Sequence, residues 1–320
     1  MARPRVVFLG TPEFAAVALR RLLAPDSPVE VVGVVTQPDR PVGRSRQLVP
    51  PPVKALAGEH GLPVLQPLSL RRPAALAALQ RLRPDLGIVA AYGHILRPEV
   101  LAIPRLGYLN VHASLLPRWR GAWPVGGAIL AGDAETGVSI MRLDEGMDTG
   151  PVLARRVEPI WPEDTTTTLE GRLAALGAEL LVETLPGYVS GQIVPQPQDD
   201  RQATYCHMVR KADGVIDWAR PEVELERQVR AMQPWPVAFT TWNGKQLSIL
   251  RARVAPAPAA GTSEDPPGTV ERLGKGAAVI TGDGLLALEQ VQLEGRPPTP
   301  VASFVNGYRT FVGSRLGAGA

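Results

Sequence analysis

Short, mainly apolar runs recur through the first half of the chain, and stretches with helical spacing separate them. Such runs are typical of strands buried on both faces of a parallel sheet. The predicted strands are residues 6–9, 29–35, 86–91, 107–111 and 137–141. The predicted helices are residues 13–23, 53–59, 74–82 and 121–131. Because strands that alternate with helices indicate βαβ units, we expect an α/β domain with a parallel sheet.

The pattern changes after a long predicted helix at residues 167–188, which carries leucines at helical spacing and has threonine hydroxyls at its start. Residues 191–202 are rich in Pro, Gln and Asp, which is typical of a linker. Beyond them, short β-prone runs alternate with turn residues, and this pattern indicates a small antiparallel barrel. The predicted strands there are residues 238–242, 246–254, 268–272, 277–281 and 285–292. We therefore expect one domain at 1–190, a linker at 191–205 and a second domain at 206–320.

Charge and cysteine content limit the class of protein. The 320 residues carry a formal net charge of only +3, so bulk charge does not indicate a nucleic-acid partner. Cys206 is the single cysteine, which excludes an intrachain disulfide, and there is no cysteine-rich zinc pattern. No apolar stretch is long enough to span a bilayer, and the run at 6–9 is too short for a secretory signal. We therefore expect a cytoplasmic protein.

The stretch that is most informative about chemistry ends the predicted strand at residues 107–111. Asn110 and His112 are two residues apart, so their side chains share one face of that strand. The carboxyl ends of strands in open α/β sheets form the ligand crevice, so an amide and an imidazole meet there. Asp144 and Asp148 stand in a glycine-bounded loop that follows another predicted strand, and this loop could reach the same crevice.

These residue types fit acyl transfer to an amine. A histidine can move the proton of the attacking amine, and an asparagine amide can donate to the oxygen that gains charge. A carboxylate orients the histidine and favours its charged form, and Asp148 is the candidate for that role. Structural roles stay open at this point, because histidines can cap strand ends, and Asn and Asp often form turns.

The residues around these positions resemble a known family. Residues 110–122 (NVHASLLPRWRGA) and 144–150 (DEGMDTG) are similar to the two motifs of the folate-dependent formyltransferases. Within that superfamily, further segments resemble the methionyl-tRNA formyltransferases. They are residues 8–14 (FLGTPEF), 36–44 (TQPDRPVGR), 213–218 (DGVIDW) and 234–236 (PWP). The motifs occur in the family's order, and the resemblance covers nearly the whole chain.

The resemblance implies a Rossmann-like N-terminal catalytic domain and a C-terminal OB-like β-barrel domain. It implies 10-formyltetrahydrofolate as the formyl donor, and no metal. Matched residue by residue, Asn110, His112 and Asp148 become the catalytic trio. The residues implied for folate binding are Ser114, Leu115, Leu116, Pro117, Ala90, Tyr92, Asp144 and Gly146.

The implied acceptor is the free amino group of initiator methionyl-tRNA, and the products are N-formylmethionyl-tRNA and tetrahydrofolate for translation initiation. The implied tRNA-binding residues are Arg40, Arg44, Arg46, Arg210 and Lys211. The first three lie in a segment that could equally be a solvated surface loop. We expect a monomer.

Two other features bear on tRNA binding. The Arg118-Trp119-Arg120 stretch could add charge and stacking toward a nucleic acid, although Trp119 could instead pack in the core. Residues 206–320 hold 13 Lys or Arg against 11 Asp or Glu, so the second domain is not strongly basic. The chain departs from the family pattern at Trp123 and at Cys206-His207-Met208.

Three alternatives share part of this pattern. A sugar-nucleotide N-formyltransferase has the same catalytic motifs, but the arginine-bearing loop and the PWP segment argue against it. A formyl-folate hydrolase would have no use for the long second domain. An RNA-binding protein with a degenerate catalytic domain would not need an intact trio, and it would carry more positive charge.

Overall fold

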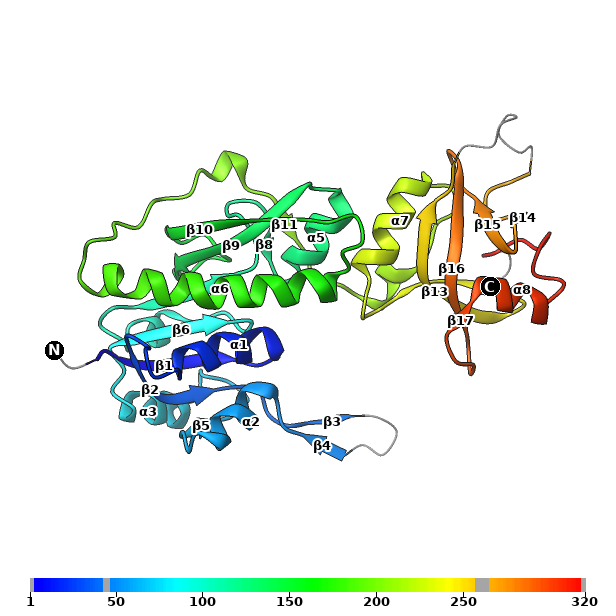
Figure 1. Cartoon of the computed structure of the whole chain (residues 1–320). Coiled ribbons are helices and arrows are strands. Elements are labelled where there is room, and N and C mark those ends of the chain that lie inside the picture. The colour runs from blue at the N-terminus through cyan, green and yellow to red at the C-terminus, as the bar shows by residue number, and fades with distance from the viewer. Residues whose placement is uncertain (1–2, 43–46, 257–264, 318–320) are drawn as a thin grey trace. The chain divides into compact units, whose positions relative to one another are not determined.

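The computed structural model describes residues 3–42, 47–256 and 265–317, and it divides into two compact units (Figure 1). The larger unit comprises Met1–Pro124, Glu135–Pro159 and Leu169–His207. The smaller unit comprises Val125–Ala134, Ile160–Thr168 and Met208–Ala320. Among the described residues, no helix is both long and apolar enough to cross a bilayer.

The larger unit is built on a seven-stranded sheet with the order β10-β9-β7-β6-β1-β2-β5. The strands are β1 (Arg5–Gly10), β2 (Glu30–Val35), β5 (Val64–Leu65), β6 (Leu86–Ala90), β7 (Tyr108–His112), β9 (Glu135–Arg142) and β10 (Val152–Pro159). The strands from β7 to β5 are parallel, which confirms the predicted α/β class. However, β9 is antiparallel to β7, and β10 is antiparallel to β9. The sheet is therefore mixed, with two antiparallel strands at one edge, which the sequence pattern does not reveal because a buried apolar run is the same in parallel and antiparallel pairing.

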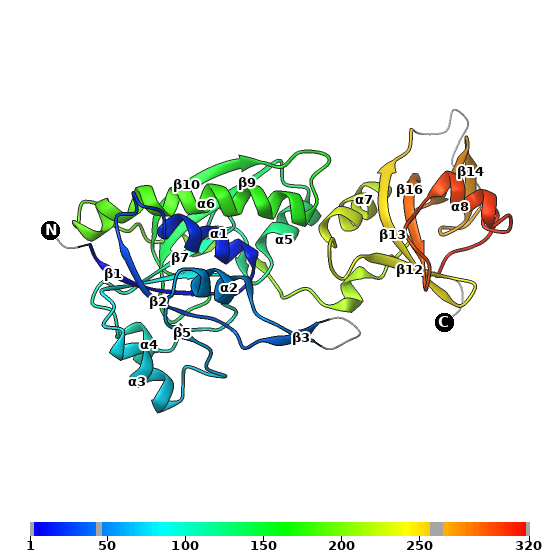
Figure 2. The same ribbon diagram turned by 60° about the horizontal axis from the view of Figure 1, so that its bottom comes forward.

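Helices cover both faces of this sheet (Figure 2). They are α1 (Glu13–Leu22), α2 (Pro52–Glu59), α3 (Pro73–Arg81), α4 (Pro98–Leu101) and α6 (Thr166–Val189). One core cluster joins Val7 and Leu9 of β1 to Leu79 of α3 and Val100 of α4. On the opposite face, α6 approaches the sheet so closely that a Cβ at Gly177 would lie 2.7 Å from a methyl carbon of Val111.

Two short pairs of strands lie outside the seven-stranded sheet. A hairpin of β3 (Arg40–Val42) and β4 (Gln47–Val49) extends away from the body of the larger unit in both views. The predicted helix at 121–131 begins later than expected, as α5 (Pro124–Ala131), because β8 (Arg120–Gly121) pairs with β11 (Tyr205–Cys206).

The segment between α6 and β11 is bonded to the larger unit along much of its length. Gln196 forms a bridge with Val152, and Arg120 N donates to Thr204 O over 2.9 Å. A short 3-10 helix, η1 (Asp200–Gln202), lies between these contacts. We call residues 196–206 the strap.

The smaller unit contains an antiparallel sheet with the order β12-β13-β16-β15-β14, and β17 pairs with β16. The strands are β12 (Ala238–Trp242), β13 (Lys245–Val254), β14 (Val270–Leu273), β15 (Gly276–Ile280), β16 (Leu285–Leu293) and β17 (Thr299–Pro300). It also contains η2 (Lys211–Gly214), α7 (Glu222–Ala231) and α8 (Val301–Gly307). Gly317 N donates to Thr241 O of β12, while Val270 N of β14 donates to Ser314 O. Residues 313–317 therefore join the two edges of the sheet, and the predicted small antiparallel domain is confirmed.

Candidate active site

Strand β7 carries two polar side chains at the carboxyl end of the parallel strands. Asn110 and His112 are only 9% and 6% exposed, and they alternate with apolar Leu109 and Val111. Because side chains two apart on a strand share a face, both point to the face that Tyr108 occupies. The strand thus holds an amide and an imidazole side by side in a largely desolvated position.

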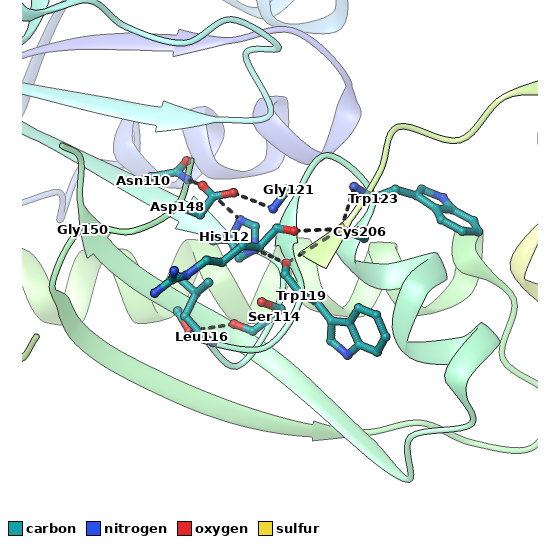
Figure 3. A network of polar contacts seen from close by, with 12 residues as sticks. Asn110, His112, Ser114, Leu116, Trp119, Gly121, Trp123, Asp148, Gly150 and Cys206 are labelled. Carbon is teal, nitrogen blue, oxygen red and sulfur yellow. Dashed lines mark hydrogen bonds and ion pairs between the residues drawn. The ribbon is translucent and has the colours of Figure 1, made fainter. Parts of the chain in front are cut away.

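Asp148 reaches both side chains through a loop that turns back on itself. The carboxyl end of β9 lies beside the start of β7, where Arg142 pairs with Leu109, so the loop has to return along β7. Asp148 Oδ1 accepts from Asn110 Nδ2 over 3.4 Å and lies 3.7 Å from His112 Nδ1. The three predicted catalytic side chains therefore meet at one carboxylate oxygen (Figure 3).

The partners of His112 identify which ring nitrogen can accept a proton. Its Nε2 lies 2.9 Å from the carbonyl oxygen of Trp119, and a carbonyl can only accept. In a neutral imidazole the proton therefore sits on Nε2, and the lone pair sits on Nδ1. Nδ1 faces Asp148, so an imidazolium formed there gains an anionic partner at once.

The second oxygen of Asp148 is held by the backbone of Gly121. Gly121 N donates to Asp148 Oδ2 over 2.9 Å. Gly121 has φ +115°, and a Cβ there would lie 2.2 Å from the carbonyl oxygen of Cys206. Only glycine fits this position, and it brings the backbone N–H to the carboxylate.

The strap also contacts the loop between β9 and β10 (residues 143–151), which carries Asp148 and which we call the catalytic loop. The linker predicted at residues 191–205 did not indicate this contact. Gln198 Nε2 donates to the carbonyls of Asp148 and Gly150 over 2.8 and 2.7 Å. Arg120 is 1% exposed and donates to Gln198 Oε1 and to Asp200. The suggestion that Arg120 contacts a nucleic acid was therefore wrong, because acceptors far along the chain bury this guanidinium. No local pattern could reveal a pair 78 positions apart.

The segment after β7, which the resemblance implies for folate binding, is strongly tied to the protein. Ser114 is fully buried, and its hydroxyl donates to Arg118 O over 2.6 Å. Leu116 is 2% exposed and packs with Met141 and Val152. Leu115 and Pro117 are half-buried. The side chains of Ser114 and Leu116 are therefore committed to contacts within the protein, and Leu116 N and O also have partners, in Ser139 and Arg155.

The other residues implied for folate lie on two neighbouring segments. Ala90 ends β6, and Tyr92 is 3% exposed, where burial raises the pKa of its phenol to about 12. Asp144 Oδ1 accepts from Gly146 N over 3.0 Å and from the Thr149 hydroxyl over 2.7 Å. Through these hydrogen bonds Asp144 stabilises the backbone conformation of the loop that carries Asp148.

A cavity of about 350 Å³ opens beside the segment after β6. Its lining includes Tyr92, His94, Ile95, Arg71 and Arg97. With two arginines against the single acid Glu99, this cavity favours an anionic ligand group. Across the described residues, no cluster of three His, Cys, Asp or Glu side chains could hold a metal ion.

The residues implied for tRNA binding belong to several parts of the chain. Arg40 is exposed on β3, and Arg210 and Lys211 are exposed at the start of η2. Arg44 and Arg46 lie outside the described residues. At the base of the β3–β4 hairpin, hydrogen bonds from Gln66 and Lys54 hold the pKa of the Asp39 carboxyl below its usual value.

Comparisons with known proteins identify the family of this chain. Residues 4–185 match the formyl transferase family, and residues 208–309 match the formyl transferase C-terminal domain. A methionyl-tRNA formyltransferase of Roseiflexus castenholzii is 54% identical over 98% of this chain and 99% of its own. One from Geobacter sulfurreducens is 46% identical over 99% of this chain and 98% of its own. HypX of Aquifex aeolicus, solved with tetrahydrofolic acid, shares the fold with a TM-score of 0.62 at 19% identity, over 97% of this chain and 48% of its own.

Proposed function

The chain belongs to the formyl transferase family, among the methionyl-tRNA formyltransferases, and on that premise we propose its reaction and the residues that carry it out. The protein transfers the formyl group of 10-formyltetrahydrofolate to the free amino group of initiator methionyl-tRNA. The products are N-formylmethionyl-tRNA, used in translation initiation, and tetrahydrofolate. The observation that carries this proposal is the meeting of Asn110, His112 and Asp148 at one carboxylate oxygen.

Each of the three side chains has a separate task. As the amine attacks the formyl carbon, negative charge develops on the formyl oxygen, and Asn110 Nδ2 can stabilise it with an N–H. His112 takes the proton that the amine releases at Nδ1, because Nε2 already donates to Trp119 O. Asp148 Oδ1, 3.7 Å away, stabilises the resulting imidazolium. When the tetrahedral intermediate collapses, the bond between the formyl carbon and N10 of the folate breaks, and the imidazolium returns its proton to N10, so that tetrahydrofolate leaves. Burial of Asn110 and His112, and partial burial of Asp148, strengthens these interactions relative to water.

The bound folate supplies an activated formyl group, and the cavity beside Tyr92 fits the other end of that molecule. Folates end in a glutamyl tail with free carboxylates, and Arg71 and Arg97 supply guanidinium groups for bidentate contacts. We place the ring system near Ala90, Tyr92 and the backbone of the Asp144 loop. The tail then extends into the cavity, away from the catalytic trio.

The double variant Arg71→Ala/Arg97→Ala tests that placement. We expect the KM for 10-formyltetrahydrofolate to rise by roughly three- to tenfold, because exposed ion pairs are each worth only about 0–1 kcal/mol. The kcat and the KM for methionyl-tRNA should stay unchanged in steady-state kinetics. Arg72→Ala is the matched control, since Arg72 is exposed beside Arg71 but does not line the cavity. An unchanged KM for folate in the double variant would show that the glutamyl tail does not bind in this cavity.

Recognition of the tRNA is proposed to involve both parts of the chain. Residues 1–190 carry the reacting side chains, residues 191–205 link the two parts and also pack against the larger unit, and residues 206–320 bind the tRNA with Arg210 and Lys211. Arg40, Arg44 and Arg46 bind its acceptor end through phosphate contacts. Exposure of Arg40, Arg210 and Lys211 supports this assignment, and resemblance alone supports Arg44 and Arg46. We also propose that the enzyme acts as a monomer in the cytoplasm.

One assay tests the proposed function directly. The protein is incubated with 10-formyltetrahydrofolate and one of three acceptors: methionyl initiator tRNA, the same tRNA uncharged, or an amino-sugar nucleotide. Formylation of the charged tRNA alone is expected, because only it presents an amine on the recognised scaffold. Formylation of the sugar nucleotide would identify the rival transferase. Release of formate without any acceptor would identify a hydrolase.

A further inference from the structure

The strap residue Gln198 lies against the catalytic loop without touching any of the reacting groups. We propose that Gln198 is a positioning residue for formyl transfer, which fixes the backbone around Asp148, and that Arg120 holds Gln198 in place. This inference rests on the proposed function, since it adds a residue to that reaction. It assigns a task to a segment that sequence patterns present only as a linker.

The hydrogen bonds of Gln198 use both ends of its side-chain amide. Nε2 donates one N–H to the carbonyl of Asp148 and the other to the carbonyl of Gly150. Oε1 accepts from Arg120 Nε over 3.1 Å and from Arg120 Nη2 over 2.9 Å. Since a guanidinium has only donors and a carbonyl only acceptors, this amide has one possible orientation. The side chain is thus a bridge of fixed direction between the loop and Arg120.

Arg120 is itself fixed by other residues of the strap. Its Nη2 also donates to Asp200 over 2.7 Å, and its Nη1 donates to the Tyr205 hydroxyl over 3.1 Å. The guanidinium lies 5.9 Å from the centre of the Tyr205 ring. A guanidinium that is almost completely buried needs several acceptors, and here the strap supplies them. Arg120 consequently resists the movement that would release Gln198.

The catalytic loop needs such support because its backbone is unusual on both sides of the contact. Asp148 has φ +54°, in the left-handed region that residues with a Cβ adopt at a cost. Gly150 lies so close to β9 that a Cβ would be 1.9 Å from the carbonyl oxygen of Arg142. A sparsely populated conformation persists only where the surroundings hold it, and Gln198 binds the carbonyls of both residues. Without it, the carboxylate of Asp148 has a wider range of positions relative to His112.

Two substitutions of Gln198 remove its hydrogen-bond donors and keep the approximate size of the side chain. Gln198→Glu keeps the size and the pairing with Arg120 but removes both donors, and Gln198→Met keeps the length without polar atoms. We expect kcat to fall by roughly 10- to 100-fold in both, because misplacement near 1 Å costs up to about 10²-fold. The KM values for folate and for methionyl-tRNA should stay within about twofold, since no substrate contact is lost. Gln202→Ala is the matched control, because Gln202 is exposed on the strap and donates to Asp199.

Kinetics and thermal unfolding of the same samples decide the outcome. A kcat within about twofold of wild type in both folded variants would overturn the proposal. A rise in KM in place of the fall in kcat would show a substrate-binding role instead. Loss of the melting transition in both variants would also overturn it, because the strap would then maintain the fold. Failure of the proposed function would appear separately, as a wild-type protein that does not formylate methionyl-tRNA.

Discussion

Replacing Asp148 by asparagine should lower the kcat of formyl transfer by ~10²- to 10⁴-fold, the range expected for loss of assisted proton transfer. Asparagine has the same shape and keeps an oxygen that can accept from Gly121 N. The substitution removes the charge that stabilises His112 as imidazolium, 3.7 Å away, and it replaces Oδ1, the acceptor for Asn110 Nδ2, by an NH2 group. Rates under single-turnover conditions with saturating folate and methionyl-tRNA measure this effect, and the melting temperature checks the fold.

Asp144→Asn is the matched control for that experiment. It removes a carboxylate from the same loop, but asparagine still accepts from Gly146 N and the Thr149 hydroxyl. Its kcat should stay within about threefold of wild type, because no charge beside His112 is lost. A similar loss in both variants would mean that loop charge in general matters. Near-full activity of Asp148→Asn would show that the Asp148 carboxylate is not needed for formyl transfer.

His112→Gln should cause a loss of similar size, again ~10²- to 10⁴-fold in kcat. A glutamine amide can reproduce the Nε2 hydrogen bond to Trp119 O, so the local fold is preserved. It offers no basic nitrogen at the position of Nδ1, so the amine proton has no acceptor. The measurement is kcat for methionyl-tRNA formylation, together with the melting temperature.

His60→Gln serves as the control for that variant, because His60 is exposed at the end of α2, outside the active site. It should behave as wild type. If His112→Gln kept more than about a tenth of the wild-type kcat, proton transfer at Nδ1 would not be the step that His112 assists.

Much of the fold could be predicted because its strands are buried on both faces. The apolar runs of β1, β2 and β6 distinguish these strands from the helices that follow, and the turns between β12 and β16 mark the second domain. The direction of β9 could not be predicted in the same way. A buried apolar run has the same residue pattern whether the strand pairs parallel or antiparallel with its neighbour. Only the pairing of Arg142 with Leu109 reveals that β9 is antiparallel.

The active site likewise contains residues that could be predicted from local sequence and residues that could not. The juxtaposition of Asn110 and His112 follows from their spacing on one strand, and it could be predicted. The convergence of Asp148 depends on a loop that reverses direction, so from the residues alone it was one possibility among several. The roles of Arg120 and Gln198 could not be predicted from the sequence. Nothing local in the sequence distinguishes a buried arginine from an exposed one, because its hydrogen-bond acceptors lie far away along the chain.

The path of the strap has a consequence for dissecting the protein. A fragment ending at residue 190 would contain the complete trio and every strand of the larger unit's sheet, and it would pass for a minimal enzyme. It would nevertheless lack Gln198, and Arg120 would keep neither Asp200 nor Tyr205 as acceptors. A truncation series or a domain exchange should therefore place its junction after His207, where the larger unit ends. A chimera joined earlier would test an incomplete active site, and its inactivity would be wrongly attributed to loss of the smaller unit.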